Sequence, residues 1–220
     1  MSRINEPSCS ANNGSGILRS FTKNMNATLA YYAQNASKFS QDTWSVEFSD
    51  TQNRFLNLLH AHPFILDFGC GSGRDTIYFL SKGCKVEACD GSAELCRIAS
   101  CNTGIKVTQK LFSELNSSDI YDGIWACASI LHLPEDELKD VLHKIHTALK
   151  DNGVLYTSFK YGEFEGMRTG RYFHDFTFES FKMLLDEVGG FSVIEHWISE
   201  DVRSDKKDEK WLNLLLRRED

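Results

Sequence analysis

The chain has 220 residues and a formal net charge of −7 at pH 7, and 41% of its residues are hydrophobic. This length suits one α/β domain and is too short for two domains of ordinary size. The hydrophobic content is above that of disordered chains, and the acidic balance disfavours a broad nucleic-acid-binding face because such a face is normally basic.

Cysteine usage and the absence of long apolar runs bear on the cellular localisation of the protein and on whether it binds a metal. No stretch approaches the roughly 20 apolar residues of a membrane-spanning helix, and the first residues, MSRINEPSCS, lack the apolar run of a secretory signal. The seven cysteines include no CxxC pair, which disfavours zinc, and their odd number disfavours a disulfide framework. His143 and His146 are close in sequence, but no third metal ligand accompanies them. We therefore expect a cytoplasmic protein with no membrane partner and no metal site.

The N-terminal quarter of the chain reads as a tail followed by helices. Residues 1–16 are polar and aperiodic, which predicts disorder. Apolar residues then recur at helical spacing from Leu18 to Leu59, and we expect two helices separated by Ser37–Thr43. The predicted organisation is a tail (1–16) and a single domain (17–220), which consists of a helical leader or cap (17–62) and a core (63–220).

From residue 63 onward, strand and helix signals alternate. The predicted strands are Pro63–Phe68, Lys85–Cys89, Ile105–Thr108, Tyr121–Ala128, Val154–Phe159, Phe191–Ile198 and Lys210–Leu216. The predicted helices are Arg74–Ser81, Ala93–Ser100 with Ser92 as its N-cap, Pro134–Leu149 and Glu179–Glu187. This alternation predicts a mostly parallel sheet with helices on both faces, and the final two strands, with no helix between them, predict an antiparallel edge.

A glycine cluster separates the first predicted strand of the core from the helix that follows it. Gly69, Gly71 and Gly73 allow unusual backbone angles and close approach of a ligand to the main chain. The following helix presents free N–H groups at its positive end. Asp90 ends the next strand, where an acid binds the ribose hydroxyls of a nucleoside. The segment therefore predicts a nucleoside-binding site.

Two features distinguish this cluster from a dinucleotide-binding site. The dinucleotide pattern GxGxxG would place its third glycine where the chain has Arg74. Asp67, just before the cluster, would repel a pyrophosphate but attract the ammonium group of an amino acid. A nucleoside joined to an amino acid without phosphate describes S-adenosylmethionine.

The motifs in this region resemble those of class I S-adenosylmethionine-dependent methyltransferases. ILDFGCGSG (65–73) resembles the family's first motif, VEACDGS (86–92) the second and YDGIWACASILHL (121–133) the fourth, while ALKDNGVLY (148–156) resembles the helix, turn and strand that follow. The resemblance implies a Rossmann-like α/β fold with a seven-stranded, mostly parallel sheet, an antiparallel last strand and helices on both faces. It also implies S-adenosyl-L-methionine as cofactor and methyl transfer as the activity.

The resemblance assigns roles to particular residues. Asp67 and the glycine loop would hold the methionine part of the cofactor, and Asp90 would bind the ribose hydroxyls beside the adenine. The segment Gln109–Ser113 lacks the acid that the family often places near the adenine amine, and Phe112 is a candidate either for packing on the base or for the core. The expected cofactor-binding residues are Asp67, Gly69, Cys70, Gly71, Ser72, Gly73, Asp90, Gly91, Ser92 and Ser129.

The acceptor is expected beyond the ends of the central strands. His132 is the candidate catalytic residue, as a base or as a group that orients the acceptor, and a polar role at the start of the next helix is the alternative. The long segment Lys160–His174 is expected to be a lid or a substrate wall, with a packed surface loop as the alternative. In this segment, Arg168, Arg171 and His174 are candidates for gripping an anion. The expected substrate residues are Tyr32, Lys160, Tyr161, Arg168, Arg171 and Tyr172.

Among methyltransferases, the motifs are most similar to the small-molecule branch that includes tellurite- and thiopurine-type enzymes. In-line displacement of the methyl group by a small-molecule acceptor is therefore the expected reaction. A tRNA methyltransferase of the wobble-uridine type, whose fourth motif is similar, is an alternative that the acidic charge disfavours. A third hypothesis is an inactive S-adenosylmethionine-binding protein that serves as a partner in a complex. The sequence does not indicate an oligomeric state.

Overall fold

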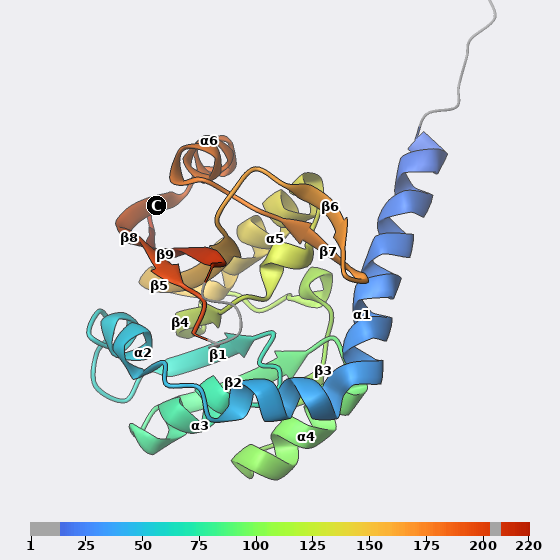
Figure 1. Ribbon diagram of the computed structural model, residues 1–220. Helices are drawn as coiled ribbons and strands as arrows, with labels where there is room; N and C mark the ends of the chain where they lie inside the picture. The colour runs from blue at the N-terminus through green and yellow to red at the C-terminus, as the bar shows by residue number, and fades with distance from the viewer. Residues whose placement is uncertain (1–13, 203–207) are drawn as a thin grey trace, which may run out of the picture.

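The computed structural model describes residues 14–202 and 208–220, with side chains from residue 25 onward. A seven-stranded sheet in the order β3-β2-β1-β4-β5-β9-β8 forms its centre, and β9 runs antiparallel to its two neighbours (Figure 1). The strands are β1 (Phe64–Phe68), β2 (Lys85–Asp90), β3 (Thr108–Gln109), β4 (Tyr121–Ala126), β5 (Leu149–Lys160), β8 (Phe191–Glu200) and β9 (Lys210–Arg218). The predicted Rossmann-like fold with its antiparallel last strand is confirmed, but the prediction that the antiparallel strand forms the edge is wrong, because β9 lies between β5 and the edge strand β8.

Helices cover both faces of this sheet. They are α2 (Ser49–Leu56), α3 (Arg74–Ser81), α4 (Ala93–Thr103), α5 (Glu135–Ala148) and α6 (Phe178–Val188), with short 3-10 turns at Phe112–Glu114 and Ile130–His132. The long helix α1 (Gly14–Trp44) packs instead against α4 and the hairpin strand β7 (Arg171–His174). Successive side chains of β1 point to opposite faces, so Leu66 packs in the cluster that includes α5 and α6. Ile65 packs on the other side with Phe55 of α2 and Phe79 of α3. Burial on both faces explains the nearly continuous apolar runs of the central strands.

The two predicted leader helices exist, but the predicted break between them is wrong. Helix α1 runs through Ser37–Thr43, and the connection to α2 lies at residues 45–48. Thr43 lies inside α1, and its hydroxyl is satisfied there because it donates to the backbone oxygen of Phe39, four residues earlier, at 2.7 Å. Of the predicted tail, residues 1–13 lie outside the described residues, and α1 begins at Gly14.

The segment expected to be a loop, Lys160–His174, contains a two-stranded hairpin. Strands β6 (Glu165–Arg168) and β7 (Arg171–His174) pair antiparallel and are joined by Thr169 and Gly170, both with positive φ (50° and 82°). A two-residue turn of this kind matches the twist of paired strands. The hairpin lies along α1 (Figure 1), so it forms a wall opposite the sheet.

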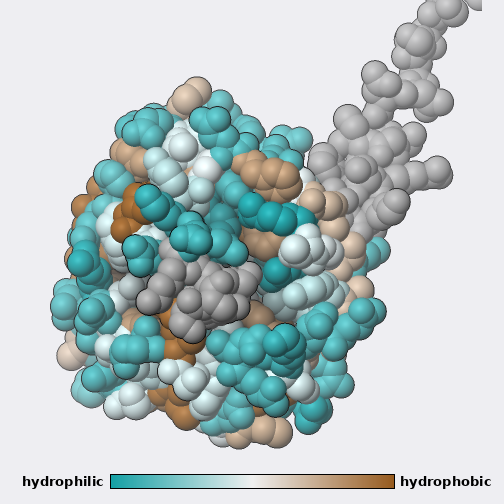
Figure 2. Space-filling model, viewed as in Figure 1, coloured by the Kyte–Doolittle hydropathy of each residue, from teal (hydrophilic) through white to brown (hydrophobic). Residues whose placement is uncertain are grey.

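Two observations describe the surface. Among residues 14–202 and 208–220, no helix is long and apolar enough to cross a membrane. On the face shown in Figure 2, hydrophilic side chains predominate and apolar ones are scattered in small groups.

Candidate functional site

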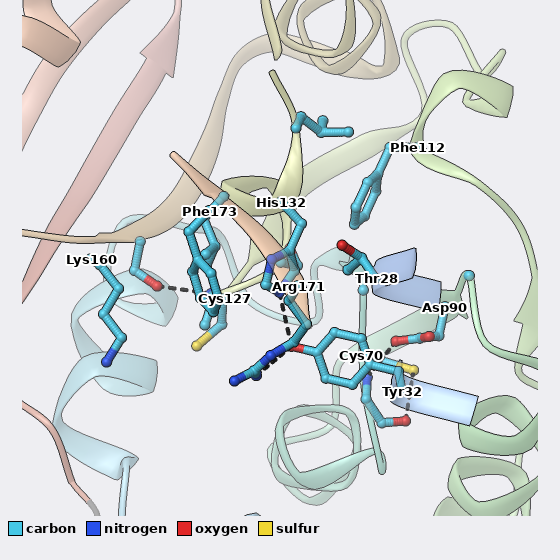
Figure 3. Close-up of a pocket in the computed structure, with 18 of the residues that line it drawn as sticks. Thr28, Tyr32, Cys70, Asp90, Phe112, Cys127, His132, Lys160, Arg171 and Phe173 are labelled. Carbon is cyan, nitrogen blue, oxygen red and sulfur yellow. Dashed lines mark hydrogen bonds between the residues drawn. The ribbon is translucent and has the colours of Figure 1, made fainter. Parts of the chain in front are cut away.

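A cavity of about 510 Å³ lies at the carboxyl ends of the central strands. Its floor comes from residues at the carboxyl ends of β2 and β5 and just after β1 and β4, and its outer wall comes from α1 and the β6–β7 hairpin. Small-molecule sites typically measure ~300–1,000 Å³, and they lie at this edge of open α/β sheets. Figure 3 shows Tyr32, His132 and Arg171 at the middle of the cavity, with Asp90 and Cys70 to one side and Lys160 to the other.

The glycine loop forms one end of this cavity, and its backbone conformation requires glycine. Gly69 has φ 87° and Gly71 has φ 58°, both in the left-handed region. A Cβ on Gly69 would lie 2.4 Å from the Cβ of Ser129, and one on Gly71 would lie 3.0 Å from the ring of Phe39. The loop therefore leaves its backbone accessible to a ligand on one side and packs closely against side chains on the other.

Asp90, the last residue of β2, lies beside this loop and is hydrogen-bonded to it. One carboxylate oxygen accepts a hydrogen bond from the Gly71 N–H at 3.0 Å, and the other accepts from the Ser92 N–H at 2.8 Å. Burial raises the pKa of Asp90 to about 6, and these two backbone hydrogen bonds oppose the shift. Each carboxylate oxygen keeps a further lone pair for a ligand hydroxyl. The arrangement suits the paired hydroxyls of a ribose.

A second buried acid, Asp67, lies beneath the glycine loop. Its carboxylate accepts a hydrogen bond from the Thr76 hydroxyl at 2.5 Å, and it is not among the described residues that line the cavity. Burial, and then the charge of Asp75, raise the pKa of Asp67. The predicted contact of Asp67 with the methionine part of a cofactor stays a prediction.

Asp75 is the centre of a polar cluster that sequence reasoning missed. Its carboxylate accepts hydrogen bonds from Arg74 at 2.8 and 2.9 Å. It also accepts from the Trp125 indole at 2.8 Å and from the Gln52 amide at 2.6 Å. Arg74, which occupies the place of the third dinucleotide-binding glycine, is thereby fixed at the cavity wall. In the sequence, the only local indication of this cluster was the pair of adjacent opposite charges, Arg74 and Asp75, at the start of a predicted helix.

Farther from the glycine loop, toward the middle of the cavity, His132 and Tyr32 form a hydrogen-bonded pair. His132 Nδ1 lies 2.6 Å from the backbone oxygen of Tyr172, an acceptor, so Nδ1 carries the proton. The opposite nitrogen, Nε2, lies 2.8 Å from the Tyr32 hydroxyl and accepts its proton in a hydrogen bond. Burial lowers the pKa of His132 to about 4, so the ring is neutral near pH 7. Burial raises the pKa of Tyr32, which Arg171 partly offsets.

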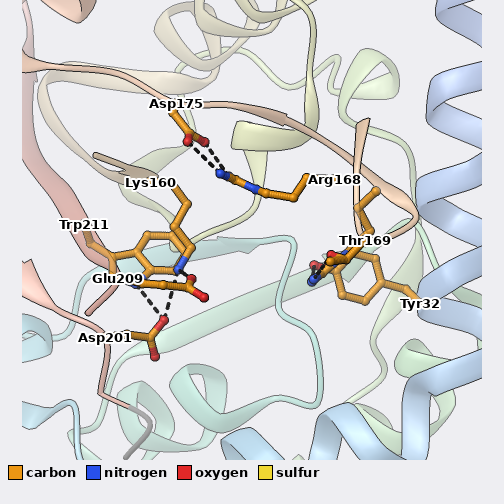
Figure 4. Close-up of polar contacts among 9 residues, drawn as sticks. Tyr32, Lys160, Arg168, Thr169, Asp175, Asp201, Glu209 and Trp211 are labelled. Carbon is orange, nitrogen blue, oxygen red and sulfur yellow. Dashed lines mark hydrogen bonds and ion pairs between the residues drawn. The ribbon is translucent and has the colours of Figure 1, made fainter. Parts of the chain in front are cut away.

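The cations of the predicted lid have different surroundings (Figure 4). Arg168 forms two hydrogen bonds with Asp175, at 3.0 and 2.8 Å. Lys160 lies 3.1 Å from Asp201, also bonds Glu209, and stands over the ring of Trp211 at 4.0 Å. His174, the third candidate for an anion, does not line the cavity within the described part of the chain.

The structure brings together most of the predicted site residues. Those that line the cavity are Tyr32, Gly69, Cys70, Gly71, Ser72, Asp90, Gly91, Ser129, His132, Lys160, Arg168 and Arg171. Those that lie outside its wall are Asp67, Gly73, Ser92, Tyr161 and Tyr172. Ser92 is the N-cap of α4, as predicted, and Tyr172 contributes backbone atoms to Thr28 and His132 while its side chain bonds Glu165. Tyr161 is exposed.

Helix α1 supplies cavity residues that sequence reasoning did not assign to the site. Thr28, Leu29 and Phe39 line the cavity together with Tyr32. These residues lie three, four or seven positions from Tyr32, on one face of the helix. The same spacing is typical of ordinary core packing, so it did not identify them as site residues. Among the described residues, no group of three or more histidine, cysteine, aspartate or glutamate side chains is arranged to hold a metal.

Comparisons with known proteins bear on this site. Residues 65–153 match the family model described as a methyltransferase domain. No curated protein sequence matches the chain.

Several solved structures have the same fold. The 1,6-didemethyltoxoflavin-N1-methyltransferase of Burkholderia thailandensis, solved with 1,6-didemethyltoxoflavin and S-adenosylhomocysteine, is 22% identical with a TM-score of 0.72, over 99% of this chain and 94% of that one. A TehB-like methyltransferase from Corynebacterium glutamicum is 21% identical with a TM-score of 0.63, over 87% and 98%. A putative methyltransferase solved with the Haloferax volcanii Trm112 activator is 15% identical with a TM-score of 0.70, over 87% and 98%. Residues 65–153 therefore match a methyltransferase domain, and the chain has the fold of S-adenosylmethionine-dependent methyltransferases, as its motifs predicted.

Proposed function

We propose that this protein transfers the methyl group of S-adenosylmethionine to a small-molecule acceptor. The observation that carries the proposal is one cavity with a nucleoside-binding end, formed by the glycine loop and Asp90, and a polar end formed by Tyr32, His132 and Arg171. Helix α1 and the hairpin border the polar end, which favours a compact acceptor over a polymer. We further propose that residues 17–62 act as a cap on one domain, residues 17–220, in the cytoplasm.

The residues present fit the cofactor. Asp90 would accept hydrogen bonds from the ribose hydroxyls, Gly91 and Phe112 would border the adenine, and the backbone of residues 69–72 would hold the amino-acid part above Asp67. S-adenosylmethionine supplies an electrophilic methyl group on sulfur, and the sulfur keeps the electron pair of the broken bond when the acceptor's lone pair attacks. The protein contributes by positioning the acceptor for in-line attack, which supplies much of the rate in such reactions.

We propose that Tyr32 positions the acceptor and that His132 positions Tyr32. The Tyr32 hydroxyl donates a hydrogen bond to His132 Nε2 and accepts one from Arg171 NH1 at 3.4 Å, so its oxygen keeps one lone pair that would accept an N–H or O–H from the acceptor. This contact would turn the acceptor's lone pair toward the methyl group. His132 is a weak base because its pKa lies near 4. Of the two predicted roles for His132, orientation of the acceptor is thus favoured over proton abstraction.

Methyl transfer from radiolabelled S-adenosylmethionine to a small-molecule panel and to bulk tRNA tests the proposed function. We expect labelled products from the panel and none on tRNA. In Tyr32→Phe, turnover should fall at least about tenfold, the loss of one oriented hydrogen bond, while affinity for S-adenosylhomocysteine changes little. Tyr78→Phe is the matched control, because the Tyr78 hydroxyl bonds Asn53 outside the cavity.

The same assay distinguishes the alternatives. Label on tRNA alone would replace the small-molecule acceptor with a nucleic acid, a possibility raised by the neighbour solved with the Trm112 activator. Cofactor binding without transfer to any acceptor would favour an inactive binding partner. Unchanged turnover in Tyr32→Phe would return the Tyr32–His132 pair to a purely structural role.

A further inference from the structure

The polar end of the cavity holds a positive charge, that of Arg171, which pairs with no carboxylate of the described residues. In the described chain, Arg171 has no acidic partner within ion-pair distance. Its NH1 lies 3.4 Å from the Tyr32 hydroxyl and its NH2 lies 3.2 Å from the Thr169 hydroxyl. Its Nε is buried without a hydrogen-bond partner among the described residues. A guanidinium has five N–H groups, so most of its donor capacity is unused.

The neighbouring cations differ from Arg171 in this respect. Arg168, on the paired strand of the same hairpin, is neutralised by the two oxygens of Asp175. Lys160 is held by Asp201 and Glu209. Arg171 is half-buried and its Nε is fully buried, and a charge that has lost part of its water normally has a partner, because desolvation without one costs free energy. The missing partner of Arg171 therefore indicates an anion that arrives with a ligand.

Aromatic rings fix the Arg171 guanidinium in place. It lies 4.4 Å from the ring centroid of Tyr31, 5.0 Å from that of Phe173 and 5.6 Å from that of Tyr32. Cation–π contacts of this kind hold the side chain and exclude water, which strengthens its attraction for an anion. Arg171 also begins β7 directly after the tight Thr169–Gly170 turn, so its backbone is constrained as well.

We infer that Arg171 binds an anionic oxygen group of the methyl acceptor, so that the acceptor is an acid: a carboxylate or an ionised phenol or enol on a largely apolar body. This inference rests on the proposed function, because it assumes that the polar end of the cavity holds the acceptor. Leu131, Leu133 and Phe173 supply the apolar wall. Since Arg171 also contacts Tyr32, an acid bound here lies beside the hydroxyl that would orient the reacting atom.

Matched pairs of aromatic acids and their amides test the inference. Benzoate and benzamide, 4-hydroxybenzoate and 4-hydroxybenzamide, and 2-naphthoate and 2-naphthamide are titrated calorimetrically into the protein saturated with S-adenosylhomocysteine. We expect at least one acid to bind and to bind at least tenfold more tightly than its amide. Arg171→Leu should remove that preference, and Arg171→Lys should retain part of it. Arg97→Leu is the matched control, because Arg97 is exposed on α4 and pairs with Glu94.

Each variant is first titrated with S-adenosylhomocysteine alone, and its melting temperature is measured. Failure of the wild-type protein to bind S-adenosylhomocysteine would overturn the proposed function and the inference together. Normal binding of S-adenosylhomocysteine with no acid bound, or with no preference for acids, would overturn the inference alone. A tenfold or greater loss of S-adenosylhomocysteine affinity in Arg171→Leu would also overturn it, because Arg171 would then hold the cofactor's own carboxylate.

Discussion

Replacing Asp90 with alanine is expected to weaken the binding of S-adenosylhomocysteine about 100-fold. The change removes two hydrogen-bond acceptors for the ribose and leaves the N–H groups of Gly71 and Ser92 without their carboxylate. Hydrogen bonds to a charged group contribute ~1.5–3 kcal/mol each, and a 100-fold loss corresponds to ~2.7 kcal/mol. Calorimetric titration measures the affinity. Asp186→Ala, an exposed position on α6, is the control, and an unchanged affinity in Asp90→Ala would remove Asp90 from the site.

The same site predicts how affinity depends on pH. Burial raises the pKa of Asp90 to about 6 in the unliganded protein, and only the ionised carboxylate presents acceptors on both oxygens. Affinity for S-adenosylhomocysteine should therefore fall about tenfold per pH unit as the pH drops below 6. Asp90→Asn should lack this slope because an amide does not titrate, whereas a wild-type affinity that stays constant down to pH 5 would contradict the assignment.

Gly69→Ala is expected to lower the free energy of unfolding by about 3 kcal/mol. The new Cβ would lie 2.4 Å from the Cβ of Ser129, and the φ of 87° is unfavourable for any residue with a Cβ. Left-handed backbone costs ~1–2 kcal/mol and overpacking ~1–3 kcal/mol. Urea denaturation measures the change, and cofactor affinity should fall with it because the loop must shift.

Two further variants separate the two causes. Gly104 has φ 75° and no atom within 4 Å of an added Cβ, so Gly104→Ala should lose only the ~1–2 kcal/mol of backbone strain. Adding Ser129→Gly to Gly69→Ala removes the clashing Cβ and should recover part of the lost stability. Equal losses in Gly69→Ala and Gly104→Ala would show that the contact with Ser129 has no steric cost.

The predicted parts of the site depend on local sequence. The glycine loop and Asp90 each follow a strand, and β1 and β2 pair in parallel with Phe68 beside Cys89. This register brings the two loop segments together, so that the Gly71 N–H meets the Asp90 carboxylate at 3.0 Å. Alternating strands and helices were enough to predict that proximity, because parallel strands end at one edge of the sheet.

The remaining features depend on tertiary placement. Local sequence offered three candidates for an anion, Arg168, Arg171 and His174, and only the fold shows that Asp175 neutralises Arg168. The contact between His132 and Tyr32 joins segments that are far apart in the chain, so no local pattern predicts it.

The β6–β7 hairpin did have a local signal. The sequence Thr169–Gly170 favours a two-residue turn. The strands on either side of this turn are only four residues long. Such short strands carry little alternation, so the pattern did not distinguish a hairpin from a loop.

Calorimetric titration of the purified full chain with S-adenosylmethionine, and separately with NADH, tests the central claim most directly. The glycine loop with Arg74 in place of a third glycine, together with Asp67 beneath it, predicts saturable binding of S-adenosylmethionine and none of NADH. The expected dissociation constant is on the order of micromolar, near −8 kcal/mol. Binding of NADH, or no binding of S-adenosylmethionine, would contradict the assignment of this cavity to a methyl-donor cofactor.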